Sequence, residues 1–165
     1  MFELEATNVK DKKELYDLLM RQVEKLLDNE RDLIASCANV ASLLYYLLPE
    51  VNWVGFYLLK GKQLVLGPFQ GKPACARINL GQGVCGAAAR DKKTVIVQNV
   101  HAFPGHIACD AASNSEIVLP VFRNDRLIAV LDIDSPVPKR FTEEDQLGLE
   151  QLINHFISLI VKPVI

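Results

Sequence analysis

The chain has 165 residues, of which 50% are hydrophobic and 23% charged, a composition typical of one globular domain and not of a disordered or fibrous protein. Its 18 Lys and Arg against 20 Asp and Glu leave a net charge of -2, and no segment is strongly basic, which argues against nucleic acid or an anionic membrane surface as the main partner. The N-terminus lacks a signal-peptide pattern, and no apolar run approaches the length of a membrane span. We therefore expect a single domain over residues 1–165 in the cytoplasm, where thiols stay reduced.

Two helices are expected at the start of the chain. Leucines and valines recur at helical spacing over residues 11–28, with charged residues between them, and a more apolar helix is expected over residues 32–48. The next segment, residues 52–71, has the pattern of two strands joined by a turn around Lys60–Lys62. The glycines and proline of "GPFQG" are expected to end the second strand.

The middle of the chain alternates short strands with one helix. Residues 74–80 alternate as a strand, residues 81–93 begin with glycines and continue as a short helix, and residues 94–100 have the pattern of another strand. A long segment follows, from about His101 to Ser115, with neither a helical nor a strand period. Long loops inside compact domains are usually functional or disordered, so this segment is a candidate for function.

The last third predicts a hairpin and a closing helix. Residues 116–135 indicate two strands that turn at Asn124–Asp125. In the final helix, Thr142 is the expected N-cap and Asp145 occupies the position of a capping-box acid. Together these elements predict an α+β fold, with a central, mainly antiparallel sheet of about six strands and helices packed on it.

The chain has four cysteines, at positions 37, 75, 85 and 109. They form no C-x-x-C pair and the histidines do not cluster, so we expect neither a fixed disulfide framework nor a metal site. Cys37 lies in the apolar second helix and is expected in the core. Cys109 differs, because it lies in a polar segment of small residues, and reactive groups concentrate on such loops.

Cys75 and Cys85 lie near the two ends of the segment "ACARINLGQGVCG". A free cysteine is more often a core residue than a reactive one. Cys85, however, lies just inside an expected helix N-terminus, where the helix dipole favours a thiolate. A loop thiol with one or two further thiols is consistent with a scheme in which one cysteine attacks an oxidised substrate and another forms a disulfide with it.

Three acids adjoin apolar strands: Glu116, Asp132 and Asp134. Asp132 and Asp134 are two residues apart on a strand and should share a face. Carboxylates so close repel each other, so at least one pKa should rise, which suits a proton donor at neutral pH; the alternative is a solvent-facing strand end. Trp53 and Tyr57 should also share a face, either as core packing or as an aromatic wall of a binding site.

Four segments together resemble one family. "GPFQGKPAC", "GVCGAAA", "GHIACDAASNSEIVLPV" and "VLDIDS" are similar to the free methionine-(R)-sulfoxide reductases, stand-alone GAF domains that reduce the R-sulfoxide of the free amino acid. The resemblance runs from about Trp53 to Asp145. It implies that Cys109 is the catalytic cysteine, that Cys75 is the main resolving cysteine and that Cys85 can take part in disulfide exchange.

The resemblance also assigns the acids and aromatics. It implies that Glu116, Asp132 and Asp134 hold the amino group of the substrate and polarise or protonate the sulfoxide oxygen, with Glu116 and Asp134 both eligible as the proton donor. Trp53 and Tyr57 would line the pocket. The family uses no bound cofactor, is recycled by thioredoxin and is typically homodimeric. Two alternatives remain open, a non-catalytic GAF domain that binds a small molecule and a thiol-based redox sensor, although neither accounts for the cysteines and the acids together.

Overall fold

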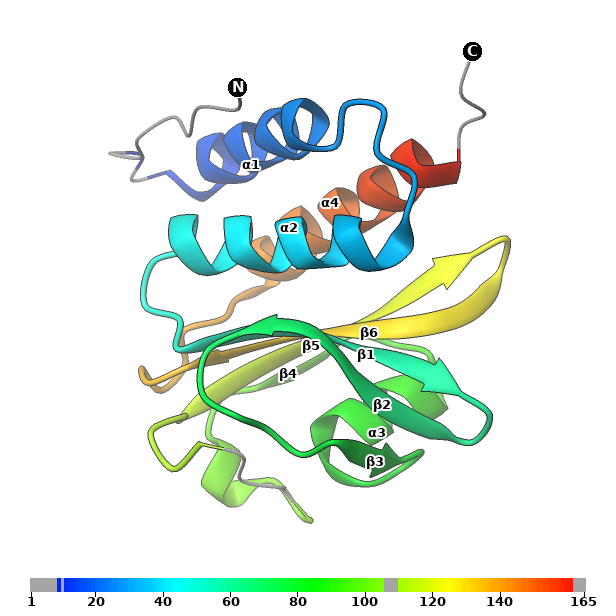
Figure 1. The fold of residues 1–165 in the computed structure, drawn as a ribbon. Coiled ribbons are helices and arrows are strands. Elements are labelled where there is room, and N and C mark those ends of the chain that lie inside the picture. Colours follow the sequence, from blue (N-terminus) through cyan, green and yellow to red (C-terminus); the bar gives the residue numbers. More distant parts are fainter. Residues whose placement is uncertain (1–8, 10, 106–109, 162–165) are drawn as a thin grey trace.

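The helices of the protein lie on both faces of one sheet (Figure 1). The structure is a computed structural model that describes residues 9, 11–105 and 110–161. Three helices lie on one side of the sheet, the first of them packed over the other two, and one helix covers the other side. The three are α1 (Lys12–Leu26), α2 (Leu33–Leu47) and α4 (Glu143–Val161), and the one is α3 (Gly83–Asp91).

The sheet has six strands, and every pair of neighbours is antiparallel. Their order across the sheet is β3-β2-β1-β6-β5-β4, so the first and last long strands of the chain, β1 and β6, meet in the middle. The strands are β1 (Trp53–Lys60), β2 (Gln63–Gln70), β3 (Arg77–Asn79), β4 (Val95–Val97), β5 (Ser115–Arg123) and β6 (Arg126–Ser135). The expected α+β architecture with about six antiparallel strands is confirmed.

Side-chain caps fix the starts of the long helices. Asp11 and Asp32 are the N-caps of α1 and α2, and each accepts a hydrogen bond from the backbone N–H three residues on. At the start of α4, the backbone N–H of Thr142 donates to Asp145 Oδ2 at 2.8 Å, which is the acid half of a capping box. The two N-terminal helices and the cap of the last one therefore form where the sequence predicts them.

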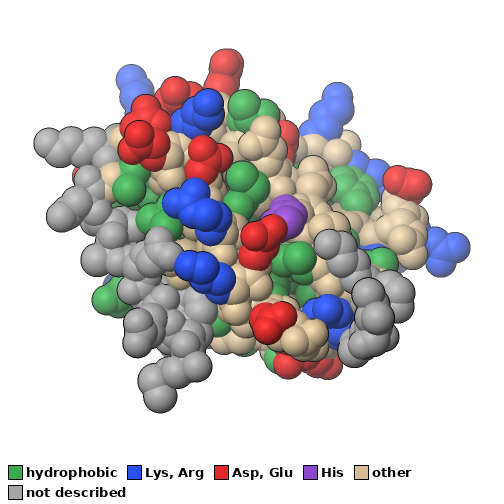
Figure 2. Space-filling model, turned by 90° about the horizontal axis from the view of Figure 1, so that it is seen from above, with side chains coloured by type: hydrophobic (Ala, Val, Ile, Leu, Met, Phe, Trp, Pro, Cys, Tyr) green, Lys and Arg blue, Asp and Glu red, His purple; other side chains and the backbone are tan. Residues whose placement is uncertain are grey.

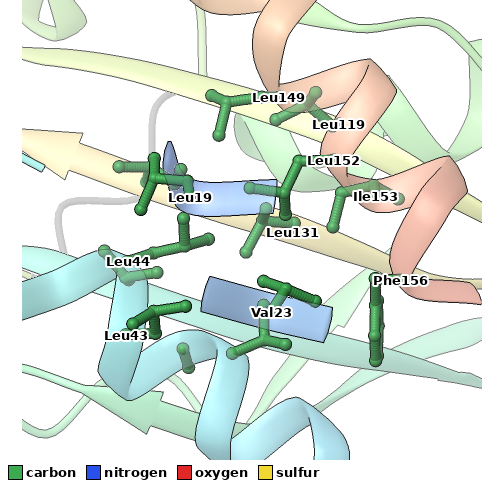
Figure 3. Close-up of a cluster of buried hydrophobic side chains, with 14 of the residues drawn as sticks. Leu19, Val23, Leu43, Leu44, Leu119, Leu131, Leu149, Leu152, Ile153 and Phe156 are labelled. Atoms are coloured by element: carbon green, nitrogen blue, oxygen red, sulfur yellow. The ribbon is translucent and has the colours of Figure 1, made fainter. Parts of the chain in front are cut away.

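The larger core lies between the sheet and the three helices on its upper face. Figure 3 shows Leu19 and Val23 of α1 beside Leu131 of β6 and Leu152 of α4, and all four are fully buried. Burial of each such side chain stabilises the fold by about 1.5–3 kcal/mol relative to exposure. Cys37 belongs to the same core, as expected, and burial raises the pKa of its thiol to about 12.

Two strands are shorter than expected. Within residues 74–80 only Arg77–Asn79 pairs, and within residues 94–100 only Val95–Val97 does, before a single 3-10 turn at Val100–Ala102. Both are edge strands with one neighbour each, so alternation of apolar residues alone does not extend them.

The second strand is longer than expected. The turn-forming residues Gly67 and Pro68 lie inside β2, which continues to Gln70. The pairing of β1 with β2 shifts register between Gly55 and Tyr57, so β2 carries one extra residue there. A bulge of this kind is where a strand tolerates proline.

The hairpin of β5 and β6 brings the predicted acids together. Its turn residues Asn124 and Asp125 have φ of 50° and 59°, the left-handed conformation of a two-residue hairpin turn, as expected from the sequence. The register then pairs Glu116 with Asp134. Asp132 precedes Asp134 by two residues on β6 and therefore lies on the same face of the sheet.

The outer surface of the helix layer is mixed in character. Figure 2, seen from this side, shows acidic, basic and apolar side chains interspersed. Within α2, however, no residue of Leu33–Leu47 is charged, and Ile34, Tyr45 and Tyr46 are 48%, 39% and 71% exposed. Among the described helices, none combines the length and apolarity required to cross a membrane.

Candidate active site

A pocket opens on the face of the sheet that α3 covers. Its empty volume is about 450 Å³, including the mouth that opens to solvent. The lining joins parts of the chain that are far apart in sequence: the start of β1, the first turn of α3, the start of β5 and the end of β6. The aromatic, sulfur-containing and acidic residues of this lining are Trp53, Tyr57, Cys85, Asp110, Glu116, Asp132 and Asp134.

Three carboxyl groups meet inside the pocket. Glu116 and Asp134 are directly opposite each other on β5 and β6, a position that brings Cβ atoms within about 5 Å. Glu116 and Asp132 are only 5% and 7% exposed. The expected sharing of one face by Asp132 and Asp134 is confirmed, and the solvent-facing alternative is wrong for Glu116 and Asp132.

Burial raises the pKa of all three carboxyl groups, and neighbouring negative charges add to the rise for Glu116 and Asp134. Burial, followed by the charges of Asp132 and Asp134, raises the pKa of Glu116 well above its ordinary value. Burial and the neighbouring negative charges likewise raise the pKa of Asp134 well above its ordinary value. Burial raises the pKa of Asp132 only to about 6, because hydrogen bonds from Cys85 and Glu116 lower it. The site thus contains two carboxyl groups whose raised pKa favours the protonated form, beside Asp132, whose pKa two hydrogen bonds limit to about 6.

Aromatic rings form one wall of the pocket. The Trp53 ring stacks on Tyr57 at 6.0 Å and on Phe69 at 5.3 Å, measured between ring centroids, and its indole N–H donates to Lys72 O at 3.0 Å. Gly55 leaves the space for this ring, because a Cβ at that position would come within 2.4 Å of it. Both predicted aromatics therefore line the pocket and also pack against their neighbours.

Helix α3 carries Cys85 into the pocket. The side chain is 4% exposed, and its Sγ donates a hydrogen bond to Asp132 Oδ2 at 3.2 Å. Burial, followed by the charges of Asp132 and Glu116, raises the pKa of Cys85 well above its ordinary value. The expectation that the helix N-terminus favours a thiolate is therefore wrong, because a partial dipole charge is outweighed by burial beside carboxylates.

Cys75 lies in the irregular segment between β2 and β3. It is half-buried, and its carbonyl oxygen accepts a hydrogen bond from the Tyr57 hydroxyl at 3.1 Å. Its neighbour Ala74 lines the pocket. Cys75 is therefore at the margin of the site, on an irregular segment outside the helices and strands.

The third predicted cysteine, Cys109, lies outside the described residues. The next residue, Asp110, lines the pocket and accepts hydrogen bonds from Asn52 Nδ2 at 3.3 Å and Lys72 Nζ at 3.1 Å. A backbone bond from Ala112, with the lysine, lowers the pKa of Asp110. The sequence did not predict Asn52, Lys72 and Asp110 as site residues. In the sequence, these three residues are distinguished only by lying next to the aromatic and cysteine motifs.

Three residues of the pocket lie close enough together to be compared with a metal site. A sulfur of Cys85 and carboxylate oxygens of Glu116 and Asp132 lie within 4.8 Å of one another. The sequence, which has neither clustered histidines nor paired cysteines, did not indicate it. Because the Cys85 thiol donates a hydrogen bond to Asp132 Oδ2, we treat these residues as hydrogen-bonding and acid groups.

The GAF-domain family model matches residues 40–160 of the chain. Two sequence relatives are similar over most of their length. The free methionine-R-sulfoxide reductase of Escherichia coli is 53% identical over 143 residues, which is 87% of this chain and 87% of the relative. Protein YtsP of Bacillus subtilis is 54% identical over 153 residues, which is 92% of this chain and 93% of the relative.

A solved structure is similar along almost the whole chain. It is the free methionine-R-sulfoxide reductase from Neisseria meningitidis in complex with its substrate, at a TM-score of 0.91 and 42% identity. The match covers 97% of this chain and 96% of that one. The GAF-like fold expected from the sequence is confirmed by this similarity and by the family model.

Proposed function

Because the chain belongs to the GAF-domain family and, within it, to the free methionine-R-sulfoxide reductases, we propose that it is an oxidoreductase that converts free L-methionine (R)-sulfoxide to methionine. The observation that supports this most strongly is the pocket in which three carboxyl groups, two buried and one half-buried, lie beside a wall of aromatic rings. A free amino acid has an ammonium group, which requires an anionic partner, and a sulfoxide oxygen, which requires a proton donor.

The carboxyl groups divide these two tasks. Asp132, whose pKa of about 6 leaves it mainly ionised at neutral pH, binds the ammonium group. Glu116 and Asp134, whose raised pKa favours the protonated form, polarise or protonate the sulfoxide oxygen. Trp53 and Tyr57 enclose the apolar part of the substrate. This assignment is supported by the hydrogen bonds from Cys85 and Glu116, which lower the pKa of Asp132 alone among the three. Carboxyl groups in different environments can provide an anion and an acid in one site.

Cys109 is the nucleophile in this proposal. An unperturbed thiol is only about 3% thiolate at neutral pH, so the attack depends on an activated sulfoxide. The Cys109 thiolate attacks the sulfur, the oxygen is protonated by a carboxylic acid and transferred to Cys109, and methionine leaves. The substrate sulfur is reduced by two electrons and the cysteine is oxidised to a sulfenic acid, so the step is balanced. The position of Asp110 in the pocket lining supports this assignment.

Cys75 resolves the sulfenic acid. Its thiol condenses with Cys109 to form a disulfide and releases water. Thioredoxin then reduces the disulfide with its own dithiol, which becomes a disulfide in turn, and no bound cofactor takes part. This cycle operates in a compartment with a reducing thiol pool, so we place the protein in the cytoplasm.

We also propose a homodimer. The uncharged outer side of α2, with Ile34, Tyr45 and Tyr46 exposed, is the contact surface. Aromatic residues are enriched and charged residues depleted in the cores of protein interfaces, which supports this choice.

The direct test of the activity uses the two epimers. The protein is incubated with dithiothreitol and either epimer of free methionine sulfoxide, and methionine is quantified. We expect continuous turnover of the R epimer and little of the S epimer. A folded sample that releases no methionine from the R epimer would favour the small-molecule-binding or redox-sensing alternatives.

A further inference from the structure

The sulfur of Cys85 is joined to a carboxylate inside the pocket. Cys85 lies in the first turn of α3, and its Sγ is 3.2 Å from Asp132 Oδ2. A carboxylate oxygen can only accept, so the thiol is the donor. Both partners are buried, and at the low dielectric of a buried site a hydrogen bond to a charged group is stronger than one in water.

The surroundings of Cys85 do not suit a resolving cysteine. A resolving thiol must ionise and approach its partner until the two sulfurs are about 2.05 Å apart. Burial beside carboxylates raises the pKa of Cys85 well above its ordinary value. The helix around it is also held, because Gly86 packs so closely that a Cβ would come within 2.4 Å of Asn79 O. Cys75, by contrast, lies in an irregular segment outside the helices and strands and is only half-buried.

The bond instead determines how Asp132 presents its second oxygen. Asp132 Oδ2 is engaged by the thiol, whereas the buried Oδ1 has no hydrogen-bond partner among the described residues. Asp132 lines the pocket, and its Oδ1 is shielded from solvent. An unpartnered buried carboxylate oxygen costs free energy until a donor arrives, and the ammonium group of an amino acid is such a donor.

We infer that Cys85 is a positioning residue, whose S–H···O bond orients Asp132 so that Oδ1 receives the ammonium group of the free amino acid. The inference rests on the proposed function and goes further than it, because it removes Cys85 from disulfide exchange. The thiol keeps its proton throughout the catalytic cycle, and no bond to its sulfur forms or breaks.

Two substitutions of Cys85 separate the roles by kinetics. Cys85→Ser keeps a donor and Cys85→Ala removes it, so we expect the KM for the free sulfoxide to rise about tenfold in the alanine variant. We expect the serine variant to stay within about twofold of wild type, and kcat to change less than KM in both. Cys37→Ala, in the opposite core, is the matched control and should leave KM unchanged. Equal loss of thioredoxin-linked turnover in the serine and alanine variants, with unchanged KM, would identify a resolving cysteine and overturn the inference.

A second measurement does not depend on turnover. The S–H stretching band of Cys85 is assigned in Raman spectra of the reduced protein by its loss in Cys85→Ser, and we expect it at the lower frequency of a hydrogen-bonded thiol. Asp132→Asn should shift it toward the free-thiol frequency, because a neutral amide is a weaker acceptor than a carboxylate. A band that is absent, or unmoved by Asp132→Asn, contradicts the inference even in a variant that folds poorly. If wild type shows the shifted band but reduces no sulfoxide, the proposed function fails and the S–H bond to Asp132 stands.

Discussion

Glu116 and Asp134 face each other across neighbouring strands in a pocket that excludes most of the solvent. Two ionised carboxylates in that arrangement would repel each other, and like charges directly opposite on a sheet are destabilising. Burial first, and neighbouring negative charges second, raise the pKa of both carboxyl groups, which favours their protonated forms. Such a cross-strand pair would be unfavourable in a purely structural sheet. Beside a substrate pocket it provides carboxyl groups that can donate a proton.

The first prediction concerns stability. The pKa of Glu116 is raised in the folded state, so the folded protein binds this proton more tightly than the unfolded chain does. Stability is then greatest below the unfolded value of about 4.3 and falls as pH rises through the folded one. Glu116→Gln cannot ionise, so we expect it to stabilise the protein by about 1 kcal/mol or more at pH 8 and to flatten the pH dependence. Thermal melts from pH 5 to pH 8 measure both effects.

The control for this measurement is Asp125→Asn, an exposed change in the β5–β6 turn, where asparagine tolerates the left-handed conformation. It should leave the pH dependence as in wild type. A Glu116→Gln variant that melts below wild type at pH 8 would mean that the ionisable carboxyl group stabilises the fold at that pH, which contradicts its raised pKa.

The second prediction identifies the proton donor. The donor must be protonated, so methionine release in a single turnover should fall as pH rises through its pKa. Substitution of the true donor, by Glu116→Gln or Asp134→Asn, should remove this alkaline limb and slow release by about 100-fold. The other variant should keep the limb. Rapid-quench measurements from pH 6 to pH 9 distinguish the two, and an unchanged limb in both variants would exclude both residues.

The third prediction separates the cysteines. Cys109→Ala should release no methionine, since it lacks the attacking sulfur. Cys75→Ala should release about one methionine per chain in a single turnover and then stop under thioredoxin, because the sulfenic acid is left unresolved. Cys37→Ala is the matched control and should cycle normally. Identical single-turnover yields from the Cys109 and Cys75 variants would show that the two roles are wrongly assigned.

The fourth prediction tests the dimer surface. Tyr46 is the most exposed of the aromatic residues on α2, so Tyr46→Glu should place a charge in the interface and shift the protein toward monomer. Sedimentation velocity over a range of concentrations measures the shift. Lys60→Glu, which also adds negative charge but at the β1–β2 turn, should sediment as wild type. A wild-type protein that remains monomeric at high concentration would contradict this assignment.

The sequence predicted those parts of the site that depend on local geometry. The period of a strand is enough to place Asp132 and Asp134 on one face, and the turn at Asn124–Asp125 follows from residues that tolerate positive φ. The predicted pKa rise among the acids is confirmed, but its largest cause is burial, with repulsion second for Glu116 and Asp134.

Other parts depended on tertiary packing and could not be predicted. The state of Cys85 depends on which carboxylates a distant strand brings to α3, so its helix position alone indicated the wrong direction of its pKa shift. The bonds from Asn52 and Lys72 to Asp110 join segments 38 or more residues apart. Such contacts leave no periodic signal in the sequence. The limits of the edge strands were missed for a similar reason, since they depend on pairing partners and not on alternation.

The central claim is that buried carboxyl groups select a free amino acid by its ammonium group. It is tested most directly by comparing kcat/KM for free methionine (R)-sulfoxide with that for its N-acetyl derivative, with dithiothreitol as reductant. A site built around an ionic hydrogen bond rejects an analogue without the charge, so we predict a loss of at least about 100-fold on acetylation. Equal kcat/KM values for the two compounds would contradict the claim.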